Sequence, residues 1–270
     1  DFGLQDGAVA AMYGVALGVN PELRVFNLTH EIETYNIWNA SYRLVQTLQY
    51  WPEGTVFVSV VDPGVGSERK SVVAKTKDGK YIVTPNNGTL THIHLNIGIE
   101  EIREIDETKN RLPYSNDSYT FHGRDIYAFT GARLATGVIS YEEVGPKLDL
   151  EEISLLNTGE VKIENGNTIQ GTIDILDVRF GNLWTNIPKE DFENLGIKYG
   201  DTVELTINHD SRKVYSSTVK YVKSFSEVNT GATLLYVNSL HKIGVAINQG
   251  SFSKAHQVDS GYQWKVEFKK

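Results

Sequence analysis

The chain of 270 residues carries a formal net charge of −8, with 40% hydrophobic and 22% charged residues. This composition is typical of a soluble globular protein, long enough for one large domain or two smaller ones. The acidic charge and the scattered lysines and arginines argue against a nucleic-acid partner, because phosphates require a basic surface. The sequence has no run of the roughly 20 apolar residues that a membrane-spanning helix needs. It also has no cysteine, which excludes disulfides and cysteine nucleophiles.

The chain opens at Asp1-Phe2-Gly3 with neither an initiator methionine nor a signal-like apolar run. We therefore expect that a preceding segment has been removed or is not included. We expect a cytoplasmic location.

The first half alternates between helix-like and strand-like patterns. Helices are expected over residues 8–17, 36–51 and 125–137, and strands over residues 23–29, 55–61, 71–76 and 81–85. The run 55–61 is almost continuously apolar and rich in valine, which is typical of a strand buried in a parallel sheet. The alternation predicts an α/β domain over residues 1–152 with a mostly parallel central sheet.

The pattern changes after Leu150, where the acidic stretch 149–152 and Asn157-Thr158-Gly159 indicate a linker. Beyond it lie short strand-like runs separated by turn signals, over residues 202–207, 213–222, 233–237, 243–247 and 263–268. These runs predict a second domain over residues 160–270, built as an antiparallel barrel or sandwich.

Two segments, residues 61–70 and 120–125, carry the most chemistry. Asp62 follows the predicted strand 55–61, and ligands of open parallel sheets bind beyond the carboxyl ends of the strands. Together, Asp62, Arg69 and His122 have the side chains to hold and polarise a water molecule. Taken singly, each has an ordinary interpretation: a turn-forming aspartate, a solvated arginine and a structural histidine.

Other polar and aromatic residues are weaker candidates. Asp1 and Asp6 flank a turn and can accept hydrogen bonds from a ribose diol, although Asp6 is equally suited to cap the first helix. The segment 177–186 joins an acid, aromatics and amides, which suits a purine or an amino-acid group, or else a barrel turn with core aromatics. Tyr35 and Phe225 lie in turn-rich surroundings that favour a core role.

A metal site is not expected. His92 and His94 alternate on what the pattern allows as a strand, but no third ligand is placed beside them. The sequence also contains no Walker phosphate loop, no dinucleotide-binding glycine motif and no nucleophile elbow.

Five motifs occur in a characteristic order: Asp1-Phe2-Gly3, Val61-Asp62-Pro63-Gly64-Val65-Gly66, Pro85-Asn86-Asn87-Gly88, Phe121-His122-Gly123-Arg124-Asp125 and Phe180-Gly181-Asn182. As a set they resemble the S-adenosyl-L-methionine (SAM) hydroxide adenosyltransferases, which are SAM hydrolases related to fluorinase and chlorinase. The resemblance runs from Asp1 to the closing strands.

The resemblance implies an N-terminal α/β domain, a C-terminal β-barrel and a homotrimer with active sites between subunits. It implies that water displaces methionine from C5′ of SAM to give adenosine and L-methionine, with no cofactor or metal. By position, Asp62, Arg69 and His122 match the family's water-handling residues. The positions that match substrate contacts are Asp1 and Asp6 for the ribose, Tyr35 for the sugar and sulfonium, Thr120 and Phe121 for the C5′ side, Asp177 and Asn182 for the methionine part, Phe225 for adenine and Ser239 for the methionine carboxylate. Phe180 is a further substrate-binding candidate.

Three positions depart from the halogenases of this group. They carry tyrosine where this chain has Asp62, and fluorinase carries serine where it has Gly123; both differences argue against halide as the nucleophile. They carry arginine where this chain has Leu240, so the methionine carboxylate is expected to be held differently. The alternatives to hydrolysis are a SAM-dependent halogenase and a non-catalytic protein that binds SAM or adenosine.

Overall fold

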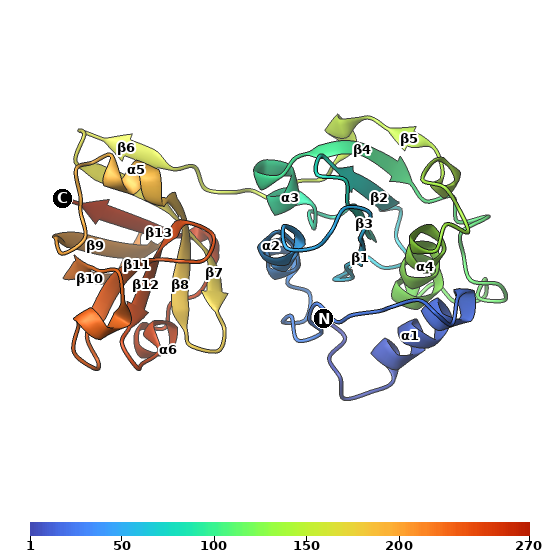
Figure 1. Ribbon diagram of the computed structural model, residues 1–270, viewed down its shortest axis with the longest axis horizontal. Coiled ribbons are helices and arrows are strands. Elements are labelled where there is room, and N and C mark those ends of the chain that lie inside the picture. The colour runs from blue at the N-terminus through green and yellow to red at the C-terminus, as the bar shows by residue number, and fades with distance from the viewer. The chain divides into compact units, whose positions relative to one another are not determined.

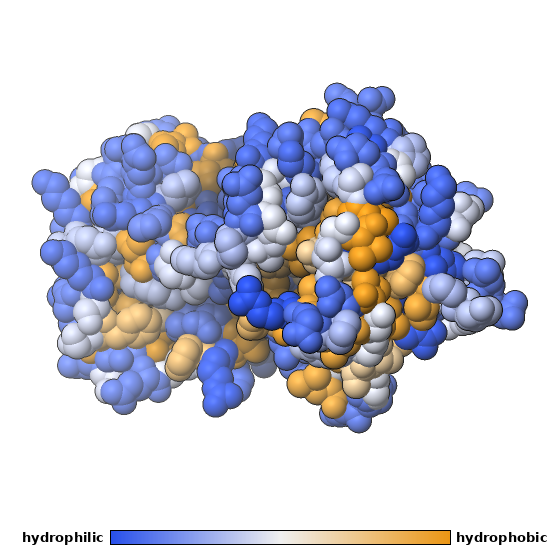
Figure 2. All heavy atoms as spheres, turned by 45° about the vertical axis from the view of Figure 1, so that its right-hand side comes forward, coloured by the Kyte–Doolittle hydropathy of each residue, from blue (hydrophilic) through white to orange (hydrophobic).

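The computed structural model describes residues 1–270, which divide into two compact units, residues 1–156 and 157–270 (Figure 1). None of the helices combines the length and apolar character that crossing a membrane requires. The face shown in Figure 2 is largely hydrophilic, with hydrophobic residues gathered in patches.

The first unit is a five-stranded sheet between two groups of helices. Its strands are β1 (Val56–Val58), β2 (Ser71–Thr76), β3 (Tyr81–Pro85), β4 (Ile99–Glu104) and β5 (Lys147–Leu148), in the order β1-β3-β2-β4-β5. Its helices are α1 (Ala8–Val19), α2 (Ile37–Leu48), α3 (Thr91–Asn96), the π-helix η1 (Gly123–Ala128), α4 (Phe129–Ala135) and the 3₁₀-helices η2 (Glu142–Val144) and η3 (Leu150–Glu152). In Figure 1, α1 and α4 lie on one side of the sheet and α2 and α3 on the other.

The prediction of a mostly parallel sheet is wrong. Only β1 and β3 are parallel, whereas β2 pairs antiparallel with β3 and β4, and β4 pairs antiparallel with β5. The reason lies in the connection between β2 and β3, which spans only residues 77–80 and turns at Gly79 with φ of 78°. A parallel pair needs a crossover of a dozen or more residues, so this short connection forces a hairpin.

The predicted strand over residues 23–29 is also absent, and this segment is irregular. No strand of the chain pairs with it, and a single run of strand-forming residues has little stability without a partner. As a consequence, Val25, Phe26 and Leu28 are exposed. By contrast, the helices expected over residues 8–17 and 36–51 are confirmed as α1 and α2, and the helix expected over 125–137 corresponds to η1 and α4.

The second unit is a closed barrel. Its strands are β6 (Lys162–Glu164), β7 (Thr168–Asp177), β8 (Asn182–Pro188), β9 (Thr202–His209), β10 (Arg212–Tyr221), β11 (Thr233–Val237), β12 (Lys242–Ile247) and β13 (Gly261–Lys269). They follow the order β13-β9-β10-β11-β12-β8-β7-β6, and pairing of β13 with β7 closes a ring of seven strands that excludes β6. The barrel is antiparallel as predicted, except that β10 and β11 are parallel.

Short helices and aromatic residues complete the barrel. The helices are α5 (Lys189–Glu193), η4 (Phe225–Glu227) and α6 (Phe252–His256). Phe192 of α5 is fully buried, and its ring lies 5.1 Å from that of Tyr221 and 5.3 Å from that of Phe268. The helix α5 therefore anchors strands β10 and β13 around a common apolar core.

Candidate active site

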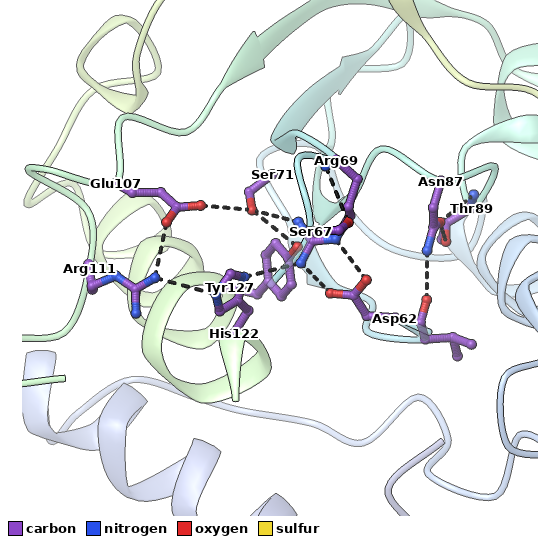
Figure 3. A network of polar contacts seen from close by, with 11 residues as sticks. Asp62, Ser67, Arg69, Ser71, Asn87, Thr89, Glu107, Arg111, His122 and Tyr127 are labelled. Atoms are coloured by element: carbon purple, nitrogen blue, oxygen red, sulfur yellow. Dashed lines mark hydrogen bonds and ion pairs between the residues drawn. The ribbon is translucent and has the colours of Figure 1, made fainter. Parts of the chain in front are cut away.

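Asp62 lies where the chain leaves the edge of the first sheet. The side chain of Asn87 donates to the carbonyl of Val61 over 2.9 Å, and the Thr89 hydroxyl donates to Asn87 Oδ1 over 2.8 Å (Figure 3). These bonds fix the residue directly before Asp62. The Pro85–Gly88 motif, which follows β3, therefore sets the position at which the Asp62 side chain begins.

The loop between Asp62 and Arg69 turns sharply. The Val65 N–H donates to the Asp62 carbonyl over 3.2 Å, and Gly66 adopts a left-handed φ of 78°. A Cβ atom at Gly66 would lie 3.0 Å from the carbonyl oxygen of Tyr119, which is tighter than ordinary packing allows. Glycine is required here because of this backbone conformation and because a second loop approaches so closely.

Asp62, Arg69 and His122, which the sequence suggested as a set able to hold water, lie side by side (Figure 3). Arg69 Nε donates to Asp62 Oδ1 over 2.7 Å, and Arg69 Nη2 donates to Asp62 Oδ2. The same Nη2 lies 3.1 Å from His122 Nδ1. The Asp62 carboxylate thus accepts two hydrogen bonds from the guanidinium, and the guanidinium in turn faces the His122 imidazole.

All three side chains are largely removed from solvent. The side chains of Asp62 and Arg69 are 5% and 11% exposed, and His122 is 4% exposed. Burial lowers the pKa of His122, and Arg69 and Arg111 lower it further, whereas Glu107 and Asp62 raise it. The imidazole is therefore neutral at physiological pH, and it lies beside Arg69, a fixed cation that can donate hydrogen bonds.

His122 stands at the start of the π-helix η1, directly before Gly123. π-helical turns are rare and are frequent at functional sites. Arg124 and Asp125 form an internal ion pair with Nε 2.6 Å from Oδ1, and the Asp125 side chain is fully buried. This pair fixes the first turn of η1 and so contributes to the placement of His122.

The structure adds four residues to this polar group that the sequence did not single out: Ser71, Glu107, Arg111 and Tyr127. Arg69 Nη1 donates to Ser71 Oγ over 3.0 Å, and the Arg69 guanidinium lies 5.6 Å above the Tyr127 ring. Glu107 and Arg111 belong to the loop between β4 and η1. Their spacing follows no known motif, so only the folded chain reveals their place.

Asp1 and Tyr35 are brought together in the first unit. The Tyr35 N–H donates to Asp1 Oδ2 over 2.8 Å, and Tyr35 has a left-handed φ of 69° and is 70% exposed. The prediction that favoured a core role for Tyr35 on general grounds is therefore wrong. Asp6 accepts a hydrogen bond from the Ala8 N–H over 2.9 Å, and this contact supports the start of α1.

Phe121 and Thr120 precede His122 in the same segment. The Phe121 ring lies 5.3 Å from the Phe2 ring, which also packs against Gly123. Thr120 is exposed, with its hydroxyl 3.1 Å from that of Ser118. The Asp1-Phe2-Gly3 segment is thereby joined to the segment that carries His122.

The second unit has its own group of predicted site residues at the β7–β8 hairpin. Asp177 and Asn182 are opposite each other in the strand register, and Asn182 is buried. Phe180 lies in the turn between them and is 64% exposed. The Gly181 N–H donates to the Asp177 carbonyl over 2.6 Å, with Gly181 at a φ of 71°. The hairpin thus places an acid, an amide and an exposed aromatic ring together.

Aromatic residues lie near this hairpin. Trp184 Nε1 donates to the Tyr236 hydroxyl over 2.9 Å, and the Tyr236 ring lies 5.0 Å from that of Phe225. Burial raises the pKa of Tyr236 to about 12, with a smaller contribution from Asp177, although hydrogen bonds with Trp184 and Asn182 oppose the increase. Asn248, which the sequence did not single out, donates to the carbonyl of Val228 over 2.9 Å and so fixes the chain after η4.

Ser239 does not join the β7–β8 group within this unit. It is exposed in the turn between β11 and β12. Strand β12 pairs with β8 such that Lys242 lies opposite Pro188, whereas Asn182 begins β8. Ser239 and Asn182 therefore lie at opposite ends of the same strand pair.

His92 and His94 lie on the helix α3, so the interpretation of this segment as a strand is wrong. His92 is buried, with its Nδ1 2.9 Å from Ser41 Oγ and its ring 4.7 Å from that of Trp38. No three His, Asp or Glu side chains are grouped so that they could hold a metal ion.

Known proteins confirm the resemblance seen in the motifs. Residues 1–145 match the SAM hydroxide adenosyltransferase N-terminal domain, and residues 171–265 match the C-terminal domain. The chain is 35% identical to the (R)-S-adenosyl-L-methionine hydrolase of Methanocaldococcus jannaschii over 96% of this chain and 90% of that protein. It is 26% identical to a fluorinase of Actinopolyspora mzabensis over 98% of this chain and 94% of that protein.

A solved structure is similar over the full length. The crystal structure of an uncharacterized conserved protein from Thermotoga maritima matches with a TM-score of 0.90 and 34% identity, covering 100% of this chain and 98% of that one. The chain belongs to the SAM hydroxide adenosyltransferase family.

Proposed function

We propose that this protein hydrolyses SAM to adenosine and L-methionine by attack of water at C5′. The observation that carries the proposal is the contact of Asp62, Arg69 and His122 in a buried site of a family member. A relative that is 35% identical is named (R)-S-adenosyl-L-methionine hydrolase, which supports the same reaction here.

In this reaction the nucleophile, water, needs assistance from the protein, whereas the leaving group, methionine, does not. In the reaction a bond forms between C5′ and the water oxygen, the C5′–S bond breaks, and methionine leaves with the bonding electron pair. Because the sulfonium is positively charged, methionine leaves as a neutral thioether and needs no general acid. We therefore propose that no metal or cofactor takes part. The water must lose a proton, which is the step that the protein assists.

Arg69 is suited to hold the incoming oxygen. A guanidinium has five N–H groups, and four of them have partners: two contact Asp62, one Ser71 and one His122. One Nη1 hydrogen remains available to donate to water or to the hydroxide that develops from it. Because Asp62 fixes the guanidinium beforehand, little reorganisation is needed when charge develops.

A halogenase is the second candidate, since the chain is similar to fluorinases. Two features oppose it. A carboxylate at position 62 repels a halide ion, and a Cβ atom at Gly123 would lie 2.9 Å from the Phe2 ring and 3.3 Å from Val60. A serine at that position, as in fluorinase, would thus require Phe2 to move.

Incubation of the purified protein with SAM in ¹⁸O-labelled water tests the proposal. The expected result is adenosine with ¹⁸O at the 5′-hydroxyl and an equal amount of L-methionine, measured by mass spectrometry. A parallel sample with excess chloride or fluoride should give the same products. Formation of 5′-halo-adenosine instead would favour the halogenase, and intact SAM that is bound but never consumed would favour a binding protein.

We also propose that the protein is a homotrimer with active sites at subunit interfaces. Support comes from the resemblance and from exposed apolar side chains in the first 28 residues, namely Leu4, Leu17, Val25, Phe26 and Leu28. Large exposed apolar side chains close together in sequence are typical of surfaces that another chain covers. Sedimentation equilibrium should give three times the mass of 30.2 kDa, and a monomer at micromolar concentration would contradict the proposal.

A further inference from the structure

His122 has a guanidinium group at each of its two ring nitrogens. Nδ1 lies 3.1 Å from Arg69 Nη2, and Nε2 lies 3.3 Å from Arg111 Nη2. Guanidinium nitrogens only donate hydrogen bonds, whereas a neutral imidazole has one acceptor nitrogen and an imidazolium has none. The two arginines therefore compete for a single acceptor, and a protonated ring would satisfy neither.

Arg111 is built into the site and is not a mobile surface residue. Its side chain is 7% exposed, and Nη2 donates to Glu107 Oε2 over 3.1 Å. Its guanidinium carbon lies 5.1 Å from the ring centre of Tyr119, and that ring lies 6.5 Å from the His122 ring. The cation is thus held against the imidazole by a carboxylate on one side and an aromatic face on the other.

Glu107 connects Arg111 back to Arg69. Its Oε1 accepts from Ser71 Oγ over 3.3 Å, and Ser71 Oγ accepts from Arg69 Nη1 over 3.0 Å. The contacts close a ring of five side chains that runs through Arg69, Ser71, Glu107, Arg111 and His122 (Figure 3). The Tyr127 hydroxyl, 3.2 Å from Ser71 Oγ, donates to it, because Ser71 uses its own hydrogen for Glu107.

We propose that Arg111 and Glu107 are positioning residues for the reaction at Asp62, Arg69 and His122. Arg111 occupies the Nε2 side of His122 and keeps the imidazole neutral and oriented, and Glu107 anchors Arg111 and supplies its counter-charge. The inference rests on the proposed hydrolysis for its catalytic meaning, but the geometry of the ring is independent of any substrate.

Arg111 and Glu107 change the pKa of His122 in opposite directions. The charged groups that face the imidazole are Asp62 and Arg69 from the loop after β1, and Glu107 and Arg111 from the loop before η1. Arg111 lowers the pKa of His122 and Glu107 raises it. Arg111→Met should therefore raise this pKa, and Glu107→Gln should lower it, whereas mere loosening of the loop would move both variants the same way.

NMR titration of the His122 ring in the SAM-free protein tests this sign, with the resonance assigned by its loss in His122→Gln. The acid limb of kcat/KM for SAM hydrolysis should follow, moving to higher pH in Arg111→Met and to lower pH in Glu107→Gln. At the pH optimum, kcat of Arg111→Met should fall by about tenfold or more with KM changed far less, as for an interaction made mainly in the transition state. Arg111→Lys keeps the cation and should retain the wild-type acid limb.

Arg133 provides a matched control. Its Nη1 donates to the Lys109 carbonyl over 2.8 Å and to Asn110 Oδ1 over 2.7 Å, so it anchors the same loop without facing His122. Arg133→Gln should leave the His122 titration at its wild-type position. Equal titration of His122 in the wild type, Arg111→Met and Glu107→Gln would overturn the inference, as would an equal shift in Arg133→Gln. Because the titration needs no SAM, a wild type without hydrolysis overturns the proposed function separately.

Discussion

Each unit of the protein buries an ion pair, and the two pairs differ in where the chain places them. Asp62 and Arg69 lie in a loop at the edge of a sheet, and Arg69 also contacts His122 and Ser71. Asp174 lies on β7 and Lys242 begins β12, two strands away in the barrel wall, with Lys242 Nζ 3.4 Å from Asp174 Oδ2. Burial alone does not separate them, since Asp62 and Asp174 are both less than 10% exposed at the side chain.

We propose that the first pair serves catalysis and the second serves the fold. When a buried ion pair lies on regular strands, the pairing of the strands fixes its backbone. Such a pair needs only enough hydrogen bonds to offset the cost of desolvation. The pair in the loop instead lies beside a turn that glycine adopts readily, at Gly66, and Arg69 also contacts an imidazole. We therefore expect substitutions in the first pair to change the rate and substitutions in the second to change stability.

Replacement of Asp62 should have the largest effect. Asp62→Ala frees the Arg69 guanidinium from its bidentate partner, so the donor for the nucleophile is no longer fixed. We expect kcat for SAM hydrolysis to fall by about 10²- to 10³-fold, the usual effect of losing one preorganised electrostatic element. Steady-state kinetics with circular dichroism as a check of folding measure this. Glu100→Ala, which breaks the exposed pair with Lys75, should retain full activity, and equal loss in both variants would contradict the distinction.

Removal of Lys242 should have the next largest effect, on stability and not on rate. Lys242→Met leaves the Asp174 carboxylate buried without its cation, which costs about 3 kcal/mol of unfolding free energy at neutral pH. Burial raises the pKa of Asp174, so protonation relieves the cost as pH falls, and the variant should approach wild-type stability in acid. Urea unfolding at several pH values measures both effects.

A double substitution provides the control for this result. Lys242→Met combined with Asp174→Asn removes both charges, so the unfolding free energy at neutral pH should recover most of the loss. The kcat of the folded protein should stay within about twofold of wild type in both variants, since rate and stability are separate quantities here. A tenfold loss of kcat in the double variant would show that the barrel pair belongs to the active site.

The sequence predicted the barrel better than the sheet because barrel strands follow local rules. Alternating runs and turn residues between them are enough to indicate β9 to β13. In the first unit the direction of β2 and β3 depends on the four-residue connection at Gly79, which the strand patterns do not contain. The run 23–29 has a strand composition, but a strand also requires a partner that the rest of the chain must supply.

The residues of the polar site also divide into those that sequence motifs indicated and those that only the folded chain reveals. Asp62, Arg69 and His122 were accessible from motifs because each adjoins glycines or turn residues with a recognisable order. Arg111 and Glu107 have no such context, and Arg111 reaches His122 because the segment between β4 and η1 folds back on itself. Contacts between loops are set by tertiary packing, which single-sequence patterns do not encode.

Substitution of Gly123 should reduce stability less than removal of Lys242, and it tests whether close packing around Gly123 holds His122 in place. A Cβ atom there would lie 2.9 Å from the Phe2 ring, so Gly123→Ala must displace Phe2 or shift η1. We expect a loss of about 1–2 kcal/mol of unfolding free energy, typical of overpacking, together with reduced kcat because His122 is the neighbouring residue. Gly14→Ala in α1, where nothing lies within 4 Å, should be neutral or stabilising in the same thermal unfolding assay.

Substitution of Gly66 should have a similar effect on stability, and it tests whether the turn at Gly66 sets the geometry of Asp62 and Arg69. Gly66→Ala places a side chain at a φ of 78° and 3.0 Å from the Tyr119 carbonyl oxygen, so about 1–2 kcal/mol of stability should be lost. Gly64→Ala is the matched control, because its nearest neighbour is the movable Ser67 hydroxyl at 3.3 Å. If the loop sets the Asp62–Arg69 geometry, kcat should fall in Gly66→Ala and stay near wild type in Gly64→Ala. Unchanged kcat in Gly66→Ala, with the expected loss of stability, would mean that Asp62 and Arg69 keep their geometry without this turn.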